Sequence, residues 1–201
     1  MQTIRALFWD VGGVLLTNAW DHEERDQAVE HFLLDKTEFE SRHKELLLPF
    51  EEGKLTLDDY VERAVFYTPR TFSREEFKQF MFSLSRPKPQ AIELARELSR
   101  KYGLAVINNE SRELNQYRIQ QFHLAEIFHL FVSSCFVGIR KPDLRIFQLA
   151  LNLTQYSADE CCFIDDRPEN LAGAEKTGLK AVLVKDAQQL RKDLQSLGVE
   201  P

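Results

Sequence analysis

The sequence has few cysteines and no long apolar run. Its three cysteines (Cys135, Cys161 and Cys162) are odd in number and lack the spacing of a metal site. We therefore expect reduced thiols in a protein core, and a cytoplasmic location. No stretch approaches the roughly 18 apolar residues that a membrane span requires, so no membrane partner is expected. Arg5 and Asp10 interrupt the apolar N-terminal stretch, which argues against a secretory leader.

The chain also has fewer basic than acidic residues. The formal net charge is −6 at pH 7, from 26 Lys plus Arg and 32 Asp plus Glu. A mildly acidic chain repels the phosphate backbone on average, so nucleic acid is not expected as the main partner. A small phosphorylated metabolite remains compatible with this charge, because a local cation or a metal ion decides binding there.

The chain does contain enough apolar material for a sizeable core. Its 201 residues fit one large domain or a core domain with an insertion, and 43% of them are hydrophobic. Fifteen Phe against two Met and two Trp predict a core that packs mainly on aromatic rings.

Five short apolar segments predict β-strands. They cover residues 4–9, 104–107, 130–133, 161–164 and 181–184. Continuous apolar runs of this length suit strands that are buried on both faces of a parallel sheet. From residue 87 onward, amphipathic helical patterns alternate with these segments. This order predicts an α/β fold with a doubly wound parallel sheet.

A long insertion separates the first predicted strand from the others. It contains no convincing strand and predicts four amphipathic helices, near residues 22–34, 38–48, 57–67 and 74–84. Thr37, Thr56 and Ser73 are the expected N-caps of the last three helices. We therefore expect a helical-bundle cap that lies over the end of the first strand. The predicted division is a core domain of residues 1–17 and 87–201, with a cap domain of residues 18–86.

Polar and charged residues follow four of the predicted strands. They are Asp10 with Gly12 and Gly13, then Asn108 with Asn109, then Arg140-Lys141-Pro142, and finally Asp165 with Asp166. Each group alone has an ordinary explanation as a turn, a helix cap or a solvated lysine. Because ligands bind doubly wound sheets at the carboxyl ends of the strands, their shared placement predicts an active site.

The same residues resemble the four motifs of the haloacid dehalogenase-like hydrolases. Asp10 with Gly13-Val14 is similar to the first motif, Asn108-Asn109 to the second, Arg140-Lys141-Pro142 to the third and Phe163-Ile164-Asp165-Asp166-Arg167 to the fourth. The resemblance covers the whole chain and includes the helical cap after the first motif. Within the family, the chain is similar to phosphatases that resemble sugar-1-phosphatases.

This resemblance implies a Mg²⁺-dependent phosphatase that hydrolyses small phosphate monoesters. Asp10 would attack phosphorus and form an aspartyl-phosphate. Mg²⁺ would be held by Asp10, the Gly12 carbonyl and Asp165, while Asp166 would act through water or Lys141.

The resemblance also implies how phosphate is held. Lys141 would add positive charge to the transferring phosphoryl group, and the amides of Asn108 and Asn109 would hold its oxygens. The cap would choose the substrate, through a loop at residues 51–56 that carries Glu52.

Two positions depart from the family pattern. Many family phosphatases carry a second Asp two residues after the nucleophile, where this chain has Gly12. Without that acid, we expect leaving groups that need little protonation to be favoured, unless a cap residue such as Glu52 or His22 replaces it. The second motif usually opens with Ser or Thr, where this chain has Asn108.

Two other functions remain open from the sequence. A 2-haloacid dehalogenase would use the same nucleophile on carbon without a metal, and the absent second Asp favours it. The acidic pair Asp165-Asp166 argues against it, because a metal-free site has no use for two more carboxylates beside the nucleophile. The third possibility is a catalytically weak member that binds a phosphorylated ligand. The oligomeric state is not predicted.

Overall fold

A five-stranded parallel sheet forms the centre of the larger part of the molecule. The computed structural model describes residues 3–201 and orders the strands β3-β2-β1-β4-β5. Their bounds lie within two residues of the predicted segments: β1 Ala6–Trp9, β2 Gly103–Asn108, β3 Leu130–Ser133, β4 Cys161–Asp165 and β5 Lys180–Leu183. The doubly wound α/β fold expected from the sequence is therefore confirmed.

The register of the central strand β1 decides what surrounds Asp10. Trp9 pairs with Val106 of β2 and with Ile164 of β4. The Asp10 main-chain N–H then donates to the Ile164 carbonyl at 2.9 Å, which sets Asp10 level with the end of β4. The residues that follow β1, β2 and β4 therefore emerge together at the carboxyl edge of the sheet.

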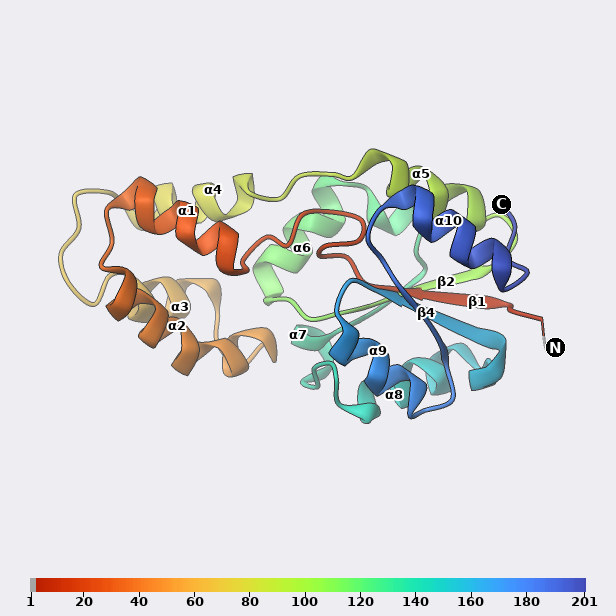
Figure 1. Cartoon of the computed structure of the whole chain (residues 1–201). Helices are drawn as coiled ribbons and strands as arrows, with labels where there is room; N and C mark the ends of the chain where they lie inside the picture. The colour runs from red at the N-terminus through yellow and green to blue at the C-terminus, as the bar shows by residue number, and fades with distance from the viewer. Residues whose placement is uncertain (1–2) are drawn as a thin grey trace.

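Helices cover both faces of the sheet (Figure 1). Two lie over one face and two over the other: α5 Pro89–Leu98 with α10 Ala187–Ser196, and α8 Leu144–Thr154 with α9 Pro168–Glu175. Leu7 and Trp9 of β1 pack in the cluster with α5 and α10, whereas Ala6 and Phe8 pack in the cluster with α8 and α9. Because both faces are buried, the strands read as continuous apolar runs in the sequence.

Four helices form a separate bundle between β1 and α5, which we call the cap. They are α1 His22–Phe32, α2 Lys36–Glu51, α3 Leu57–Ala64 and α4 Arg74–Ser83. The predicted N-caps Thr56 and Ser73 are confirmed, each in a capping box. The prediction for Thr37 is wrong, because α2 begins earlier and Asp35 caps it, accepting from the Glu38 N–H at 2.9 Å.

Aromatic side chains fill the centre of the cap, as the abundance of Phe predicts. Trp20 makes edge-to-face contacts with Phe39, Tyr60 and Phe77, at ring separations of 5.8–6.5 Å. Its indole N–H also donates to the Tyr60 hydroxyl at 2.8 Å. These contacts give the cap a hydrophobic core of its own, separate from the two clusters of the sheet.

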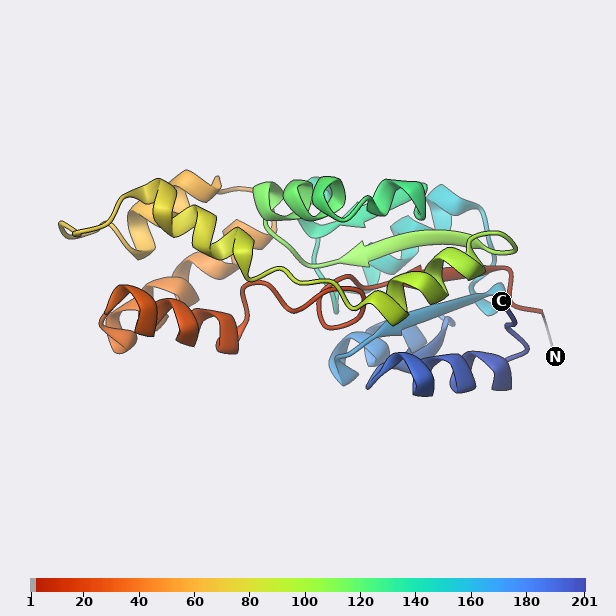
Figure 2. The same cartoon turned by 90° about the horizontal axis from the view of Figure 1, so that it is seen from above.

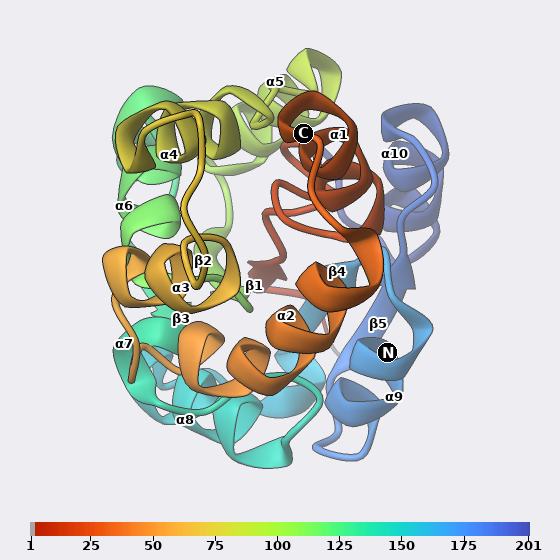
Figure 3. The ribbon, with the colours of Figure 1, turned by 90° about the vertical axis from the view of Figure 1, so that its left-hand side faces the viewer.

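The chain enters and leaves the cap through two adjacent segments (Figure 2). The Thr17 N–H donates to the Arg86 carbonyl at 2.9 Å, and the Arg86 N–H donates to the Thr17 hydroxyl at 2.9 Å. Viewed from the cap end, the cap helices stand in front of the carboxyl edge of the sheet, around the end of β1 (Figure 3). The cap therefore faces the edge that carries Asp10.

The remaining elements lie beside the sheet and the cap. They are α6 Arg112–Gln121, the short α7 Ser134–Val137 and the two 3-10 turns η1 Leu124–Glu126 and η2 Ala158–Glu160. All three cysteines are buried and unpaired, as expected. Within residues 3–201, no helix combines the length and the apolar character needed to cross a bilayer.

Candidate active site

Asp10 directly follows β1 and is 7% exposed at the bottom of the site. One of its oxygens, Oδ1, accepts from the Val11 N–H at 2.8 Å and lies 3.0 Å from Lys141 Nζ. The turn behind it depends on Gly13, whose φ is +68°. A Cβ at Gly13 would lie 1.9 Å from Asp166 Oδ2, so this turn has no room for a side chain.

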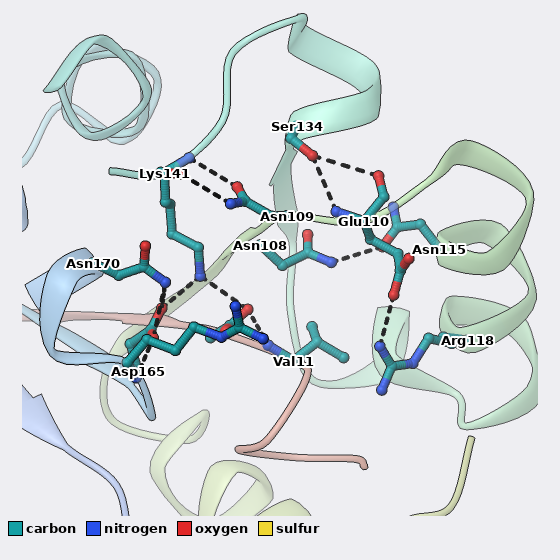
Figure 4. A network of polar contacts seen from close by, with 12 residues as sticks. Val11, Asn108, Asn109, Glu110, Asn115, Arg118, Ser134, Lys141, Asp165 and Asn170 are labelled. Carbon is teal, nitrogen blue, oxygen red and sulfur yellow. Dashed lines mark hydrogen bonds and ion pairs between the residues drawn. The ribbon is translucent and has the colours of Figure 1, made fainter. Parts of the chain in front are cut away.

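Lys141 lies between Asp10 and Asp165, and Figure 4 shows it beside Asp165. Its ammonium is buried and lies 2.5 Å from Asp165 Oδ2. Burial opposes the ammonium charge, but the carboxylates of Asp10 and Asp165 outweigh it and raise the pKa of Lys141. The lysine therefore presents a fixed positive charge beside Asp10.

The two asparagines after β2 have different places. Asn109 lines the cleft, and its side chain bonds both main-chain groups of Lys141: its Nδ2 donates to the carbonyl at 3.0 Å, and its Oδ1 accepts from the N–H at 2.8 Å. Asn108 is only 1% exposed, and its Nδ2 donates to Asn115 Oδ1 at 3.0 Å inside the protein. Asn109 thus fixes the lysine loop, and the binding of phosphate by either side chain stays a prediction.

Three carboxylates converge at this edge in a way that fits a divalent cation. One oxygen each from Asp10, Asp165 and Asp166 lies within 4.8 Å of the others. Burial raises the pKa of Asp10 to about 7; Lys141 opposes this shift, and Asp165 and Asp166 add to it. A hard cation such as Mg²⁺ would balance the excess negative charge, and carboxylate oxygens are the ligands that it prefers.

The two acidic residues after β4 differ in their partners. Both oxygens of Asp165 accept from Asn170 Nδ2 at 3.1 Å, and its Oδ1 also accepts from the Arg167 N–H at 2.8 Å. Asp166 Oδ1, in contrast, is buried and has no hydrogen-bond partner among the described residues. An orphaned buried carboxylate oxygen beside two other carboxylates is the atom most in need of a cation.

Gly12 leaves a gap in acid–base chemistry. A Cβ there would lie 3.5 Å from Asn18 Oδ1 and 3.8 Å from Arg118 Nη1, which are ordinary contact distances.

Arg118 is buried and already paired with Glu110, at 2.9 Å, and it donates to the Thr17 carbonyl. The sequence analysis missed this pair, because nothing in the local pattern shows that Glu110 and Arg118 meet.

A cleft of about 650 Å³ separates the cap from these core residues. Its lining includes Asn18, Trp20 and His22, which lie where the chain leaves the core. On the cap side, the lining is mostly polar or charged: Asp21, His22, Arg25, Thr37, Glu40, Ser41, His43, Lys44 and Glu51. The cleft therefore offers an oxygen-rich ligand many hydrogen-bonding partners.

The acidic residue that lines the cleft from the cap loop is Glu51. The predicted Glu52 lies outside the lining and pairs with Lys54 at 2.5 Å. Glu51 Oε2 lies 2.8 Å from Arg140 Nη2. Burial raises the pKa of the Glu51 carboxyl, against the opposing effect of Arg140. The sequence analysis singled out this loop, but it did not predict which of the two adjacent glutamates faces the cleft.

A buried histidine on the cap wall is a second residue that the sequence analysis missed. His43 Nδ1 lies 2.8 Å from the Tyr60 hydroxyl, which itself accepts from the Trp20 N–H. Since Tyr60 accepts from Trp20, its own proton is free to be donated to His43 Nδ1, which fits a neutral imidazole with its proton on Nε2. Burial, aided by the nearby Arg25 charge, lowers the pKa of His43 to about 4.

Comparison with known proteins fits this geometry. The family model of the haloacid dehalogenase-like hydrolases matches residues 4–178. The chain belongs to this family. The resemblance read from the four motifs is thus confirmed, whereas the likeness to sugar-1-phosphatases stays a prediction.

Individual family members are similar over almost the whole chain. The sesquiterpene phosphatase astK of Aspergillus oryzae is 28% identical over 200 residues, which cover 97% of each protein. The HAD family enzyme BT-2542 of Bacteroides thetaiotaomicron has a TM-score of 0.81 at 19% identity, covering 92% of this chain and 95% of that one. A 2-haloacid dehalogenase of Pseudomonas syringae has a TM-score of 0.67 at 16% identity, covering 96% and 99%. At these identities, the two structures share the fold.

Proposed function

We propose that the protein is a Mg²⁺-dependent phosphatase that hydrolyses a small, polar phosphate monoester. The observation that carries this proposal is the convergence of Asp10, Lys141, Asp165 and Asp166 at the carboxyl edge of the sheet, where Asp10 and Lys141 line the cleft. The similarity to the sesquiterpene phosphatase astK and to the BT-2542 structure with magnesium and inorganic phosphate supports it.

The reaction would proceed in two displacements on phosphorus. An Asp10 carboxylate oxygen forms a bond to phosphorus while the bond to the leaving oxygen breaks, which gives an aspartyl-phosphate. Water then attacks the same phosphorus, releases inorganic phosphate and restores Asp10. Lys141, fixed by Asn109 at its main chain, faces the negative charge that develops on the phosphoryl oxygens.

Asp10, the Gly12 carbonyl and Asp166 are the groups that we propose to hold Mg²⁺. The bound ion would screen the repulsion between the Asp10 carboxylate and an anionic phosphate. The sequence analysis assigned direct coordination to Asp165 and an indirect role to Asp166. The contacts favour the reverse, because Asp165 is occupied by Lys141, Asn170 and the Arg167 N–H.

The cap wall favours a polar substrate over a hydrocarbon one. Arg25 and Glu40 form a two-fold ion pair at 2.8 and 3.1 Å, and His43 lines the cleft beside them. A long apolar chain would displace water from these polar groups without replacing its hydrogen bonds, at a free-energy cost for each group. We therefore propose a leaving group rich in hydroxyl or carboxylate oxygens, although astK acts on a sesquiterpene.

The alternatives make different use of the same site. A 2-haloacid dehalogenase shares the fold and the Asp10 nucleophile, but the orphaned oxygen of Asp166 favours a site built around a cation. A weak phosphate-binding member would retain phosphate without turnover.

One assay separates the three functions. Turnover of 4-nitrophenyl phosphate and of a panel of sugar and carboxylate phosphates is measured with Mg²⁺ and with EDTA, beside release of halide from 2-chloropropionate. We expect Mg²⁺-dependent release of phosphate, and its loss in Asp10→Asn with an unchanged circular dichroism spectrum. Metal-independent halide release would establish the dehalogenase, and full phosphatase activity in Asp10→Asn would exclude Asp10 as the nucleophile.

A further inference from the structure

We propose that Glu51 of the cap supplies the acid–base group that Gly12 cannot provide. This inference rests on the phosphatase function proposed above, since it assigns a proton donor to that reaction. It names a residue of the cap, whereas the family pattern places the acid two residues after the nucleophile.

Hydrogen bonds hold the main chain of Glu51 against the catalytic loops. The Ser134 hydroxyl donates to the Glu51 carbonyl at 2.6 Å and accepts from the Glu110 N–H at 3.0 Å (Figure 4 shows Ser134 with Glu110). Glu110 directly follows Asn109, whose side chain fixes the main chain of Lys141. Two hydrogen bonds thus connect the last residue of α2 with the loop that positions the catalytic lysine.

A glycine lets the cap loop come this close. Gly53 has a φ of +69°, and a Cβ there would lie 2.2 Å from the Cys135 carbonyl of α7. No other residue type fits this conformation and this approach together. Gly53 therefore allows the end of α2 to pack directly against the core, which places Glu51 near the carboxyl edge of the sheet.

The Glu51 carboxyl is placed for proton transfer in the cleft. Its Oε2 is buried against Arg140, yet the two groups are not aligned as hydrogen-bond donor and acceptor. The side chain retains 20% of its exposure and lines the same cleft as Asp10. Burial raises the pKa of Glu51 and favours the protonated form. The charged groups that face it are Arg140, Arg167, Lys141, Asp21 and Glu110.

The other acidic or basic side chains near the cleft are engaged elsewhere. Glu110 accepts from Arg118 and from the Ser111 N–H, both at 2.9 Å, so its two oxygens are occupied. His22 Nδ1 lies 3.3 Å from the Arg25 guanidinium, so this ring nitrogen faces a hydrogen-bond donor. Of the other carboxyls that line the cleft, Asp21 is paired with Arg167 and Glu40 with Arg25, and Glu169 is exposed. Glu51 combines a buried oxygen that lacks a hydrogen bond with a place in the cleft lining.

The proposed steps balance protons and bonds. As Asp10 bonds to phosphorus and the ester P–O bond breaks, the Glu51 carboxyl gives its proton to the departing oxygen, which leaves as an alcohol. In the second step, the Glu51 carboxylate takes a proton from the attacking water. The bond between Asp10 and phosphorus breaks, inorganic phosphate leaves, and Glu51 is again protonated.

The test compares leaving groups in Glu51→Gln, which keeps the shape of the side chain. For a series from 4-nitrophenyl to unsubstituted phenyl phosphate, kcat/KM of the wild type should change little with leaving-group basicity. In Glu51→Gln, kcat/KM for phenyl phosphate should fall by about 10²–10⁴-fold, and that for 4-nitrophenyl phosphate far less. The variant should also release a burst of about one nitrophenolate per active site, because the water step lacks its base.

Three variants serve as controls. Glu52→Gln makes the same chemical change outside the cleft, and Arg140→Met removes the charged contact; both should retain the shallow dependence of the wild type. Glu51→Asp keeps a carboxyl, so it should retain the shallow dependence on leaving group at a lower overall rate. This variant covers the case in which Glu51→Gln folds poorly. An equal fall for every ester, or a steep dependence in Arg140→Met as well, would refute the inference and make Glu51 a structural contact. If the wild type itself hydrolyses no phosphate ester with Mg²⁺, the proposed function fails first.

Discussion

Gly13 holds the acidic cluster together by having no side chain. Its positive φ and the 1.9 Å separation between a built Cβ and Asp166 Oδ2 are independent constraints. Gly138 offers a matched control, because its φ is +69° and nothing lies within 4 Å of its Cβ position. Gly13→Ala combines strain with displacement of Asp166, whereas Gly138→Ala introduces strain alone.

We therefore expect the two alanine variants to differ in metal affinity. Each should lose about 1–2 kcal/mol of stability from a left-handed backbone without glycine. Gly13→Ala alone should also weaken Mg²⁺ binding by about 10–100-fold, as loss of a supporting contact around a metal does. Chemical unfolding and the Mg²⁺ dependence of phosphatase activity measure the two effects. Equal Mg²⁺ dependence in both variants would contradict the role of Gly13.

The unequal partners of Asp165 and Asp166 lead to a second prediction. Asp166→Asn should raise the Mg²⁺ concentration for half-maximal activity more than Asp165→Asn does, because only Asp166 has a free buried oxygen. Asp165→Asn should act chiefly through Lys141. In that variant, Asp10 is the one carboxylate that remains paired with the buried ammonium of Lys141. Titration of activity with Mg²⁺ in both variants checks the order, and a larger effect in Asp165→Asn would restore the sequence-based assignment.

Residue identities at the site were predictable, but their pairings were not. Asp10, Lys141 and Asp165 stand at strand ends or in strand-end loops, so the alternation of strands and helices already brings them together. The pairing of Asn108 with Asn115, and of Glu110 with Arg118, depends on how α6 packs beside the sheet. Glu51 rather than Glu52 reaches the cleft because of the rotation of α2 at its last turn, which a pattern of residue types does not fix.

At the scale of elements, the first residues of α2 show how boundaries escape a sequence reading. Both Asp35 and Thr37 are good N-cap residues, and the amphipathic pattern fits a start after either. The structure decides for Asp35, whose carboxylate accepts from the Glu38 N–H. Thr56 and Ser73 each complete a capping box with the acidic residue three positions later. Thr37 also has an acidic residue at that spacing, Glu40, so this pattern alone does not locate the start of a helix.

This difference is measurable as stability. Asp35→Ala should destabilise the protein by about 1 kcal/mol, since it removes the side chain that satisfies the first turn of α2. Thr37→Ala lies inside the helix and should change stability by less than about 0.5 kcal/mol. Urea unfolding of the two variants provides the comparison. A greater loss in Thr37→Ala would mean that α2 starts where the sequence analysis placed it.

At the scale of the whole molecule, the hydrogen bonds between Thr17 and Arg86 join the two segments that enter and leave the cap. They lie at the predicted limits of the cap, residues 18–86, and the bundle between them has its own aromatic core. The division into a core and a cap stays a prediction, which rests on a helical stretch of this length that interrupts an alternating strand and helix pattern. The contacts that hold the cap on the core, such as Asp21 with Arg167 at 2.5 Å, have no such signature.

Burial of neutral His43 in the cap makes the stability of the fold depend on pH. The pKa of His43 is about 4 in the folded protein, below the ordinary 6.5, so the unfolded chain binds the proton first. The stability that neutral His43 contributes to the folded protein is complete above pH 6.5 and is lost as the pH falls toward 4. From pH 7.5 to 5 the loss should be about 2 kcal/mol.

The comparison with His43→Gln isolates this contribution, because the other titrating groups are the same in both proteins. Urea unfolding at several pH values should show a smaller loss of stability on acidification in His43→Gln than in the wild type. Parallel curves for the two proteins would show that His43 is protonated in the folded state as easily as in the unfolded chain.

The chain's two tryptophans give each part of the molecule its own optical reporter. Trp9 is fully buried in the sheet and meets the Phe128 ring edge-on at 6.3 Å. Trp20 lies at the cleft wall of the cap, with its indole N–H bonded to Tyr60. Indole emission shifts with polarity and hydrogen bonding, so the two rings fluoresce from distinct surroundings. In a Trp9→Phe background, a change in emission on adding phosphate and Mg²⁺ would come from the cap alone, without any attached dye.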